Sequence, residues 1–245
     1  MIILFAPSEG KRQGGDASSL SRTSLIFPEL YDQRQEVIEK YAKTIHTGNY
    51  DQLKELFGLK DEKEFERYKI PLAAAPTMKA IERYDGVAYD YLAYRELSHE
   101  EQTYIDHKVL LFSNLFGPIS ASDRIPDYKL KQGSTIDSMA PEKFYKKHFT
   151  DSLNELIGDQ EVIDLRAGFY DKFYTCSRPP LTLKFLKEGK VVSHWAKAYR
   201  GIVLKTMAKS KIESFDDFMR MNIDGLSIIE IVQTDKKHEI IYAIN

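Results

Sequence analysis

The 245-residue sequence contains a single cysteine, Cys176, and this scarcity excludes several kinds of site. One thiol forms no intramolecular disulfide, and it cannot build a cysteine cage for zinc or an iron–sulfur cluster. The six histidines are scattered without the spacing of metal ligands, so we expect neither a metal nor a cofactor. Dinucleotide-binding, P-loop and nucleophile-elbow motifs are also missing, so the sequence indicates no catalytic residue.

Long apolar runs are missing too, since none approaches the roughly 20 residues that a membrane helix needs. The apolar residues 1–7 are too few for a signal peptide, and no basic residue precedes them. The sequence also lacks a repeat, a low-complexity run or a Pro/Ser-rich linker that would mark a domain boundary. We therefore expect one cytoplasmic domain over residues 1–245, with no membrane partner.

The sequence alternates between apolar runs suited to strands and amphipathic stretches suited to helices. The runs predict strands at residues 2–6, 109–112, 161–165, 181–185, 191–195, 226–232 and 239–244. Helical spacing and start signals predict helices at residues 28–43, 50–68 in two pieces, 88–95, 98–107, 141–156, 196–209 and 214–221. Strands separated by helices, with a hairpin at Glu188-Gly189-Lys190, predict an α/β (α+β) fold with a mixed β-sheet core and surrounding helices.

Positive charge is concentrated in one stretch of the chain. Between Asp164 and Lys211 the sequence carries eleven basic and three acidic residues, a local net charge of +8 in a chain of net charge −2. Such asymmetry is the electrostatic footprint of a polyanion-binding site. A helix and a hairpin with solvated lysines would give the same pattern.

The first candidate site is the loop that follows the opening strand, residues 7–15. Loops at the carboxyl ends of buried strands hold ligands in α/β folds. The glycines would let backbone amides approach an anion, and Lys11 and Arg12 would add positive charge near Ser8. A flexible surface loop is the alternative.

The second candidate is a helix-hairpin-helix pattern over residues 53–65, with its turn at Leu56-Phe57-Gly58-Leu59. In such hairpins backbone amides of the turn meet a DNA phosphate, and Gly58 leaves room for that approach. The second helix is acidic, and a helix that simply ends at a glycine is the alternative.

The third candidate is the turn-rich segment after residues 109–112. An arginine there would bind phosphate in a bidentate manner, and a tyrosine would stack on a base. The residues concerned are Arg124, Tyr128, Lys129 and Lys131. A structural loop with exposed charges is the alternative.

The fourth candidate is the basic helix at residues 196–209. Lys197 and Arg200 are three residues apart and would share a face, with Lys205 about one turn further along. The lone Trp195 is expected in the core. His194 has no identifiable acidic partner, so we expect a structural or solvated histidine rather than a general base.

Several blocks together resemble the YaaA peroxide-stress family along nearly the whole chain. They are Ala6-Pro7-Ser8-Glu9-Gly10-Lys11, Tyr84-Asp85-Gly86-Val87-Ala88-Tyr89, Ser113-Asn114-Leu115-Phe116-Gly117, Asp123-Arg124-Ile125-Pro126-Asp127-Tyr128-Lys129-Leu130, Ile163-Asp164-Leu165-Arg166-Ala167-Gly168-Phe169-Tyr170 and His194-Trp195-Ala196-Lys197-Ala198-Tyr199-Arg200-Gly201. The resemblance implies a compact α/β fold special to the family, with a helix-hairpin-helix element whose hairpin falls at residues 56–59. It also implies binding of duplex or branched DNA and protection of DNA under peroxide stress. The residues it implies for a positively charged cleft are Lys11, Arg124, Lys129, Lys197 and Arg200.

Three hypotheses about function follow. The first, favoured by charge and resemblance together, is a DNA-binding protein whose phosphate contacts are largely independent of sequence. The second is an enzyme acting on a phosphorylated or nucleotide-like small molecule in the same cleft. Its pocket would gather Ser8, Lys11, Arg124, Asp127, Lys197 and Arg200. The third is a scaffold or regulatory partner, for which no surface motif is visible. Cys176 is one candidate for sensing peroxide, although most lone cysteines are inert.

Overall fold

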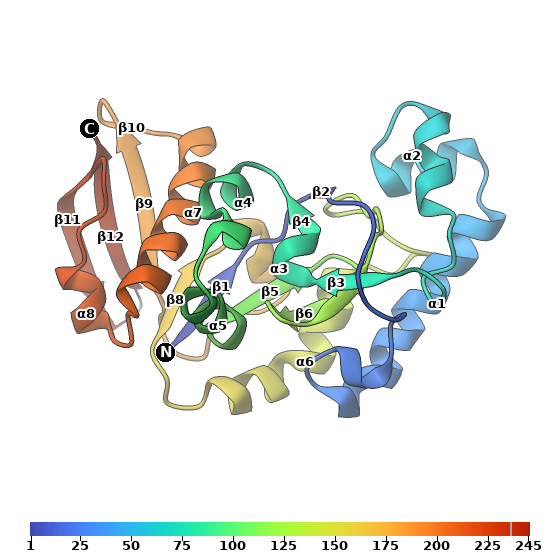
Figure 1. Cartoon of the computed structure of the whole chain (residues 1–245), viewed down its shortest axis with the longest axis horizontal. Coiled ribbons are helices and arrows are strands. Elements are labelled where there is room, and N and C mark those ends of the chain that lie inside the picture. Colours follow the sequence, from blue (N-terminus) through green and yellow to red (C-terminus); the bar gives the residue numbers. More distant parts are fainter. Residues whose placement is uncertain (236) are drawn as a thin grey trace.

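A computed structural model of the chain describes residues 1–235 and 237–245, with the side chains of residues 193, 194 and 237 outside the description. The described residues form an eight-stranded mixed sheet in the order β11-β12-β9-β8-β1-β5-β6, with β10 paired to β9 (Figure 1). Its strands are β1 Ile2–Phe5, β5 Val109–Ser113, β6 Gly117–Ser120, β8 Val162–Leu165, β9 Leu181–Lys187, β10 Lys190–Val191, β11 Leu226–Thr234 and β12 Lys237–Ile244. The predicted mixed sheet with surrounding helices is therefore confirmed.

The central strands of this sheet are parallel. β1 pairs with β5 on one side and with β8 on the other, and β8, β9 and β12 continue in the same direction. β1 is buried along its whole length, because the run Ile-Ile-Leu-Phe offers apolar side chains to both faces. The antiparallel strands β6, β10 and β11 pair with β5, β9 and β12.

The chain order creates a switch point beside β1. From β1 the chain crosses to β5 on one side, and it later returns to β8 on the other side of β1. Connections that leave in opposite directions open a crevice at the carboxyl ends of the strands, which is where α/β sheets bind ligands. The loops after β1 and β8 are therefore placed to form a site.

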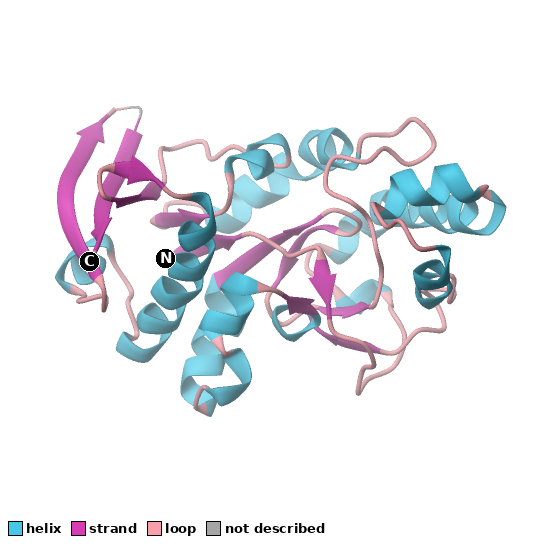
Figure 2. Cartoon of the chain, turned by 90° about the horizontal axis from the view of Figure 1, so that it is seen from above, coloured by secondary structure: helices cyan, strands magenta, loops and turns pink. Residues whose placement is uncertain are grey.

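Helices cover both sides of the sheet, as the view from above shows (Figure 2). They are η1 Arg22–Ser24, η2 Pro28–Leu30, α1 Tyr31–Thr47, α2 Tyr50–Phe57, η3 Glu62–Tyr68, α3 Ala80–Arg83, α4 Val87–Leu92, η4 Tyr94–Glu96, α5 His99–Lys108, α6 Pro141–Ile157, η5 Gly168–Lys172, α7 Ser193–Ser210 and α8 Phe215–Arg220. α7 packs closely on α4, because a Cβ at Gly201 would lie 2.0 Å from the Ala88 carbonyl oxygen. This contact fixes α7 beside the end of β1.

Two small sheets, missed by the sequence analysis, brace the loops around the site. β2 (Gly10–Lys11) pairs with β4 (Tyr84–Asp85), and β3 (Thr77–Lys79) pairs with β7 (Arg124–Pro126). Strands this short carry no readable alternation of polar and apolar residues.

One predicted strand was too long. The expected strand at residues 191–195 is only the end of β10, and α7 already begins at residue 193. Trp195, expected in the core, is 41% exposed, because it lies in the first turn of α7 beside the hairpin rather than in the sheet.

Candidate functional site

A cavity of about 560 Å³ opens where β1 and β8 end. Its walls come from residues 5–10 after β1, residues 85–89 at the start of α4, Leu165, Ala167 and Tyr170 after β8, Gln132, and Lys197 and Arg200 of α7. The volume falls within the range of about 300–1,000 Å³ that small-ligand sites occupy. Three of the predicted site residues, Ser8, Lys197 and Arg200, meet here.

Arg200 is the unusual group in this cavity. Its side chain is half-buried, and burial lowers the pKa of the guanidinium while the nearby Asp164 acts in the opposite direction. In the part of the chain that the structure describes, Arg200 makes neither an ion pair nor a hydrogen bond to protein. A desolvated cation without a partner is costly, and an anion in the cavity would remove that cost.

Other buried arginines in the molecule are fully used by the fold. Arg34 donates to the carbonyl oxygens of residues 26, 27, 116 and 118, and Arg83 donates to those of residues 12, 14, 76 and 125. Arg166 pairs with Asp164 at 2.7 Å and donates to two further carbonyl oxygens. The contrast marks Arg200 as a group that the fold does not need for itself.

The cavity lining also includes two tyrosines. Tyr89 is held by a 2.9 Å hydrogen bond from its hydroxyl to the Ala6 carbonyl, and its ring contacts Phe5 edge-on. Tyr170, after β8, is buried and also lines the cavity. No motif in the sequence indicates a role for Tyr89 or Tyr170, although both fall in blocks that carry the family resemblance.

Ser8 closes the floor of the cavity. Its hydroxyl donates to the Asp85 carbonyl at 2.5 Å and lies where a Cβ at residue 86 would clash, at 2.7 Å. Gly86 also has φ 142°, so a side chain there would be strained in any case. The floor is therefore built by close backbone approach between the loop after β1 and the start of α4.

Ser8 and Lys11 have the spacing of a serine–lysine catalytic pair, but their geometry is different. Lys11 Nζ donates to the Ser8 carbonyl at 3.3 Å and to the Glu9 carbonyl at 3.4 Å, while the Ser8 hydroxyl is directed to the Asp85 carbonyl. Lys11 is thus a clamp on the loop rather than a base for the serine hydroxyl.

Lys11 itself lies beneath the cavity loop. Its Nζ lies 4.1 Å from the ring centroid of Tyr128, whose hydroxyl shares hydrogen bonds with Tyr84 and Ser113. Burial, together with the nearby Lys129, lowers the pKa of Lys11 from 10.5 to about 7. Tyr128 is buried and, unlike Tyr89 and Tyr170, does not line the cavity, so the stacking role expected of it does not fit the structure.

Lys129 and Arg124, two further residues of the predicted cleft, already form ion pairs with carboxylates. Lys129 is buried and pairs with Glu9 at 3.4 Å, and Arg124 pairs with Asp16 at 2.7 Å on β7. Neither residue lines the cavity. The predicted cleft that joins Lys11, Arg124 and Lys129 to Lys197 and Arg200 is therefore not formed by these five side chains.

Gly58 and Lys131 come together beside the cavity rather than in it. Gly58 ends α2 with φ 68°, and its Cα faces the Lys131 stem, which a Cβ would meet at 2.8 Å. The following residue, Gln132, lines the cavity and donates its backbone amide to Glu9. The α2 turn thus borders the rim of the cavity through residues 131–132.

The remaining predicted residues contribute less. Lys205 lies further along α7 and does not line the cavity, because five residues advance a helix well past one full turn. His194 falls outside the described side chains. Asp127, proposed for the same pocket, pairs instead with Arg67 at 2.7 Å.

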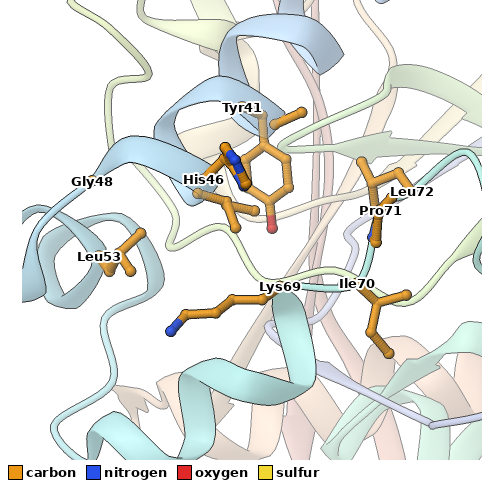
Figure 3. A pocket seen from close by; sticks show the side chains of 10 residues that line it. Tyr41, His46, Gly48, Leu53, Lys69, Ile70, Pro71 and Leu72 are labelled. Carbon is orange, nitrogen blue, oxygen red and sulfur yellow. The ribbon is translucent and has the colours of Figure 1, made fainter.

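A second cavity, of about 370 Å³, lies between α1 and residues 69–72. Tyr41, His46 and Lys69 face it (Figure 3), but the Tyr41 hydroxyl donates to the Lys129 carbonyl and Lys69 pairs with Glu66. Its polar groups are thus largely committed to the fold.

Cys176 is poorly suited to react with peroxide. The thiol is partly buried, and burial raises its pKa to about 11. Because the thiolate is the reactive form, a thiol that stays protonated at neutral pH reacts slowly.

Neither a membrane-spanning helix nor a metal-binding cluster is found among the described residues. Among them, no helix has the length and apolar character required to cross a bilayer. Within the same part of the chain, no three His, Cys, Asp or Glu side chains gather in a way that could hold a metal ion.

Comparison with known proteins gave consistent matches. The model of a family described as peroxide stress protein YaaA matches residues 1–231. The uncharacterized protein Cj0984 of Campylobacter jejuni is 44% identical over 244 residues, which is 100% of this chain and 99% of that protein. A UPF0246 protein of Corynebacterium efficiens is 32% identical over 225 residues, or 87% of each chain. Another, from Streptomyces coelicolor, is 29% identical over 215 residues, 84% of this chain and 82% of its own.

Proposed function

Because the chain belongs to the peroxide stress protein YaaA family, we propose that it acts in the response to oxidative stress by binding DNA. The contact surface is the start of α7 together with the β9–β10 hairpin. Contacts there would be made to phosphates, so the binding would be strong at low salt and largely independent of sequence.

The observation that carries this proposal is a group of cations without acidic partners. Lys187 and Lys190 face each other across the hairpin, and Lys197 and Arg200 lie on the cavity side of α7. None of the four forms an ion pair with a residue that the structure describes. Unpaired cations are free to replace the counterions of DNA, whereas paired ones would first have to release a carboxylate.

Two features of α7 add to this surface. Trp195 is exposed beside the hairpin, and Lys187 Nζ lies 5.2 Å from the centroid of its ring. An aromatic ring on which a base could stack therefore lies next to a lysine of this surface. α7 is 18 residues long, and the positive end of its dipole lies at this same start. Figure 1 shows β10, the start of α7 and α2 all toward the upper edge of the molecule.

In this proposal the predicted helix-hairpin-helix contributes a side chain rather than the backbone amide of its turn. The Gly58 amide donates to the Lys54 carbonyl as the cap of α2, and the second element, η3, is a 3₁₀ helix rather than an α-helix. Lys131, which is exposed above Gly58, is the group that would extend the DNA contact to this turn.

Fluorescence anisotropy with a labelled duplex, titrated in rising salt, tests the proposal. We expect affinity to fall steeply with salt, and the double variant Lys187→Glu/Lys190→Glu to weaken binding and flatten the salt slope by about 2. The control variant Lys147→Glu reverses one charge at an exposed lysine on α6, away from the proposed contact surface, and should leave binding unchanged. A flat salt response, or no binding to any duplex, would reject DNA as the partner.

The cavity supports a second candidate, an enzyme or receptor for a phosphorylated or nucleotide-like small molecule. The half-buried, unpartnered Arg200, which lines this cavity of about 560 Å³, favours it. Calorimetric titration with inorganic phosphate and with mononucleotides separates the two candidates. Tight binding of a mononucleotide without binding of DNA would select this second function.

A further inference from the structure

The cavity is too small for a duplex, yet it opens within the surface proposed to hold one. A continuous double helix cannot enter a space of about 560 Å³, but a single nucleotide that has left the base stack can. Lys197 and Arg200 belong to both features, because they line the cavity and also lie at the start of α7. The site is thus continuous with the DNA surface.

Its walls are arranged as a nucleotide requires. Arg200 offers a planar guanidinium without an acidic partner among the described residues, which suits phosphate, and Lys197 adds a second charge. Val87, Tyr89 and Tyr170 line the same cavity and offer an apolar surface suited to a base.

Gln132 adds a group that can distinguish a base from other flat molecules. It lines the cavity, and its backbone amide is anchored on Glu9, while its side-chain carboxamide makes no hydrogen bond with the described residues. A carboxamide offers one acceptor and two donor hydrogens, the pattern that base edges also present.

We propose that the β1–β8 cavity receives one unstacked nucleotide of a bound DNA strand, with its phosphate at Lys197 and Arg200 and its base against Val87, Tyr89 and Tyr170. This inference rests on the proposed DNA binding, and it adds that positions with an unpaired base are preferred over intact duplex. Such positions cost less to unstack, so they fill the cavity more readily.

Three labelled duplexes test the inference: one fully paired, one with a single unpaired adenosine, and one with an unpaired abasic site at the same position. The abasic duplex has the same local flexibility but lacks the base. We expect the adenosine duplex to bind about tenfold more tightly than the abasic one, the gain typical of one stacked base. Equal affinity for these two duplexes would overturn the inference while leaving DNA binding intact.

A cavity-filling variant localises the effect. Ala167→Phe places a ring in the cavity, so it should remove the preference for the unpaired adenosine and leave the affinity for the paired duplex unchanged. Ala74→Phe, at an exposed alanine away from the cavity, is the matched control and should keep the preference. A preference that survives in Ala167→Phe would place the base elsewhere. Failure of the wild-type protein to bind any of the three duplexes would instead reject the proposed function itself.

Discussion

The basic residues of segment 124–131 and those of α7 differ in what surrounds them. Arg124 pairs with Asp16 and Lys129 pairs with Glu9, so the charge of both is balanced within the fold. Lys197 and Arg200 have no such partner among the described residues, and they line a cavity. Positive charge in a sequence is therefore available to a ligand only where the fold leaves it unpaired, as it does at Lys197 and Arg200.

The largest expected effect is the difference in stability between substituting Arg166, which bonds to several protein groups, and substituting the unpaired Arg200. Arg166→Met should lower the free energy of unfolding by about 3–5 kcal/mol, because it leaves the Asp164 carboxylate, whose side chain is only 10% exposed, without its partner. Arg200→Met removes no hydrogen bond to protein and should change the same quantity by less than about 1 kcal/mol. Urea unfolding measures both, and equal losses would remove the contrast between the two arginines.

The next effect concerns the pH dependence that Lys11 gives to stability. Its pKa is lowered by burial from 10.5 to about 7, so between these values the unfolded chain holds a proton that the folded protein has released. The stability contributed by this group therefore rises with pH across that window, by at most about 1.4 kcal/mol per pH unit, and is constant below it.

Lys11→Met should remove this rise, so unfolding curves of variant and wild type at pH 7 and pH 9 provide the measurement. The charged groups that act on Lys11, namely Lys129, Asp127, Glu9 and Arg67, remain in both proteins, so the difference reports Lys11 alone. Parallel pH profiles for the two proteins would show that the buried lysine does not titrate in this range.

A smaller effect is expected where segment 124–131 meets α2. Gly58→Ala places a side chain at a left-handed backbone position, and its Cβ would lie 2.8 Å from the Lys131 side chain. The substitution should therefore lower the free energy of unfolding by about 1 kcal/mol. Gly168→Ala is the matched control, since a Cβ there meets nothing within 4 Å. Thermal unfolding of the two variants provides the measurement, and an equal shift of the midpoint temperature in both would contradict the close packing of Lys131 against the turn.

The smallest effect is expected at Cys176, the thiol in the same basic stretch of sequence. Because burial raises its pKa to about 11, Cys176→Ala should bind DNA like the wild type both before and after peroxide treatment. Anisotropy on treated and untreated protein makes the comparison. Loss of peroxide sensitivity in the variant alone would assign a sensing role to this thiol.

Much of the sheet could be predicted, because its strands are apolar runs long enough to read. The run at residues 2–6 and the helix start at Pro141 correspond to β1 and α6 within a residue or two. The cavity position also follows from the sequence in part, since the loop containing Ser8 was expected at the end of a buried strand. Lys197 and Arg200 share a face because three residues are nearly one helical turn.

The rest could not be predicted, because it depends on pairs far apart in the chain. Asp16 lies 108 residues from Arg124 and Glu9 lies 120 residues from Lys129, so nothing local indicates that these charges are balanced. Tyr128 reads as a candidate stacking ring until the fold buries it under the Glu9 loop. Tyr89 and Tyr170 come from α4 and η5, which are far apart in the chain, and only the sheet order brings them together.

The most direct test of the account compares one arginine from each group. Arg200→Met and Arg124→Met each remove one positive charge, and duplex binding is measured by anisotropy for both at the same salt concentration. The account predicts that Arg200→Met weakens binding about tenfold, while Arg124→Met, already paired with Asp16, changes it less than about twofold. Equal losses, or a larger loss at Arg124, would contradict it.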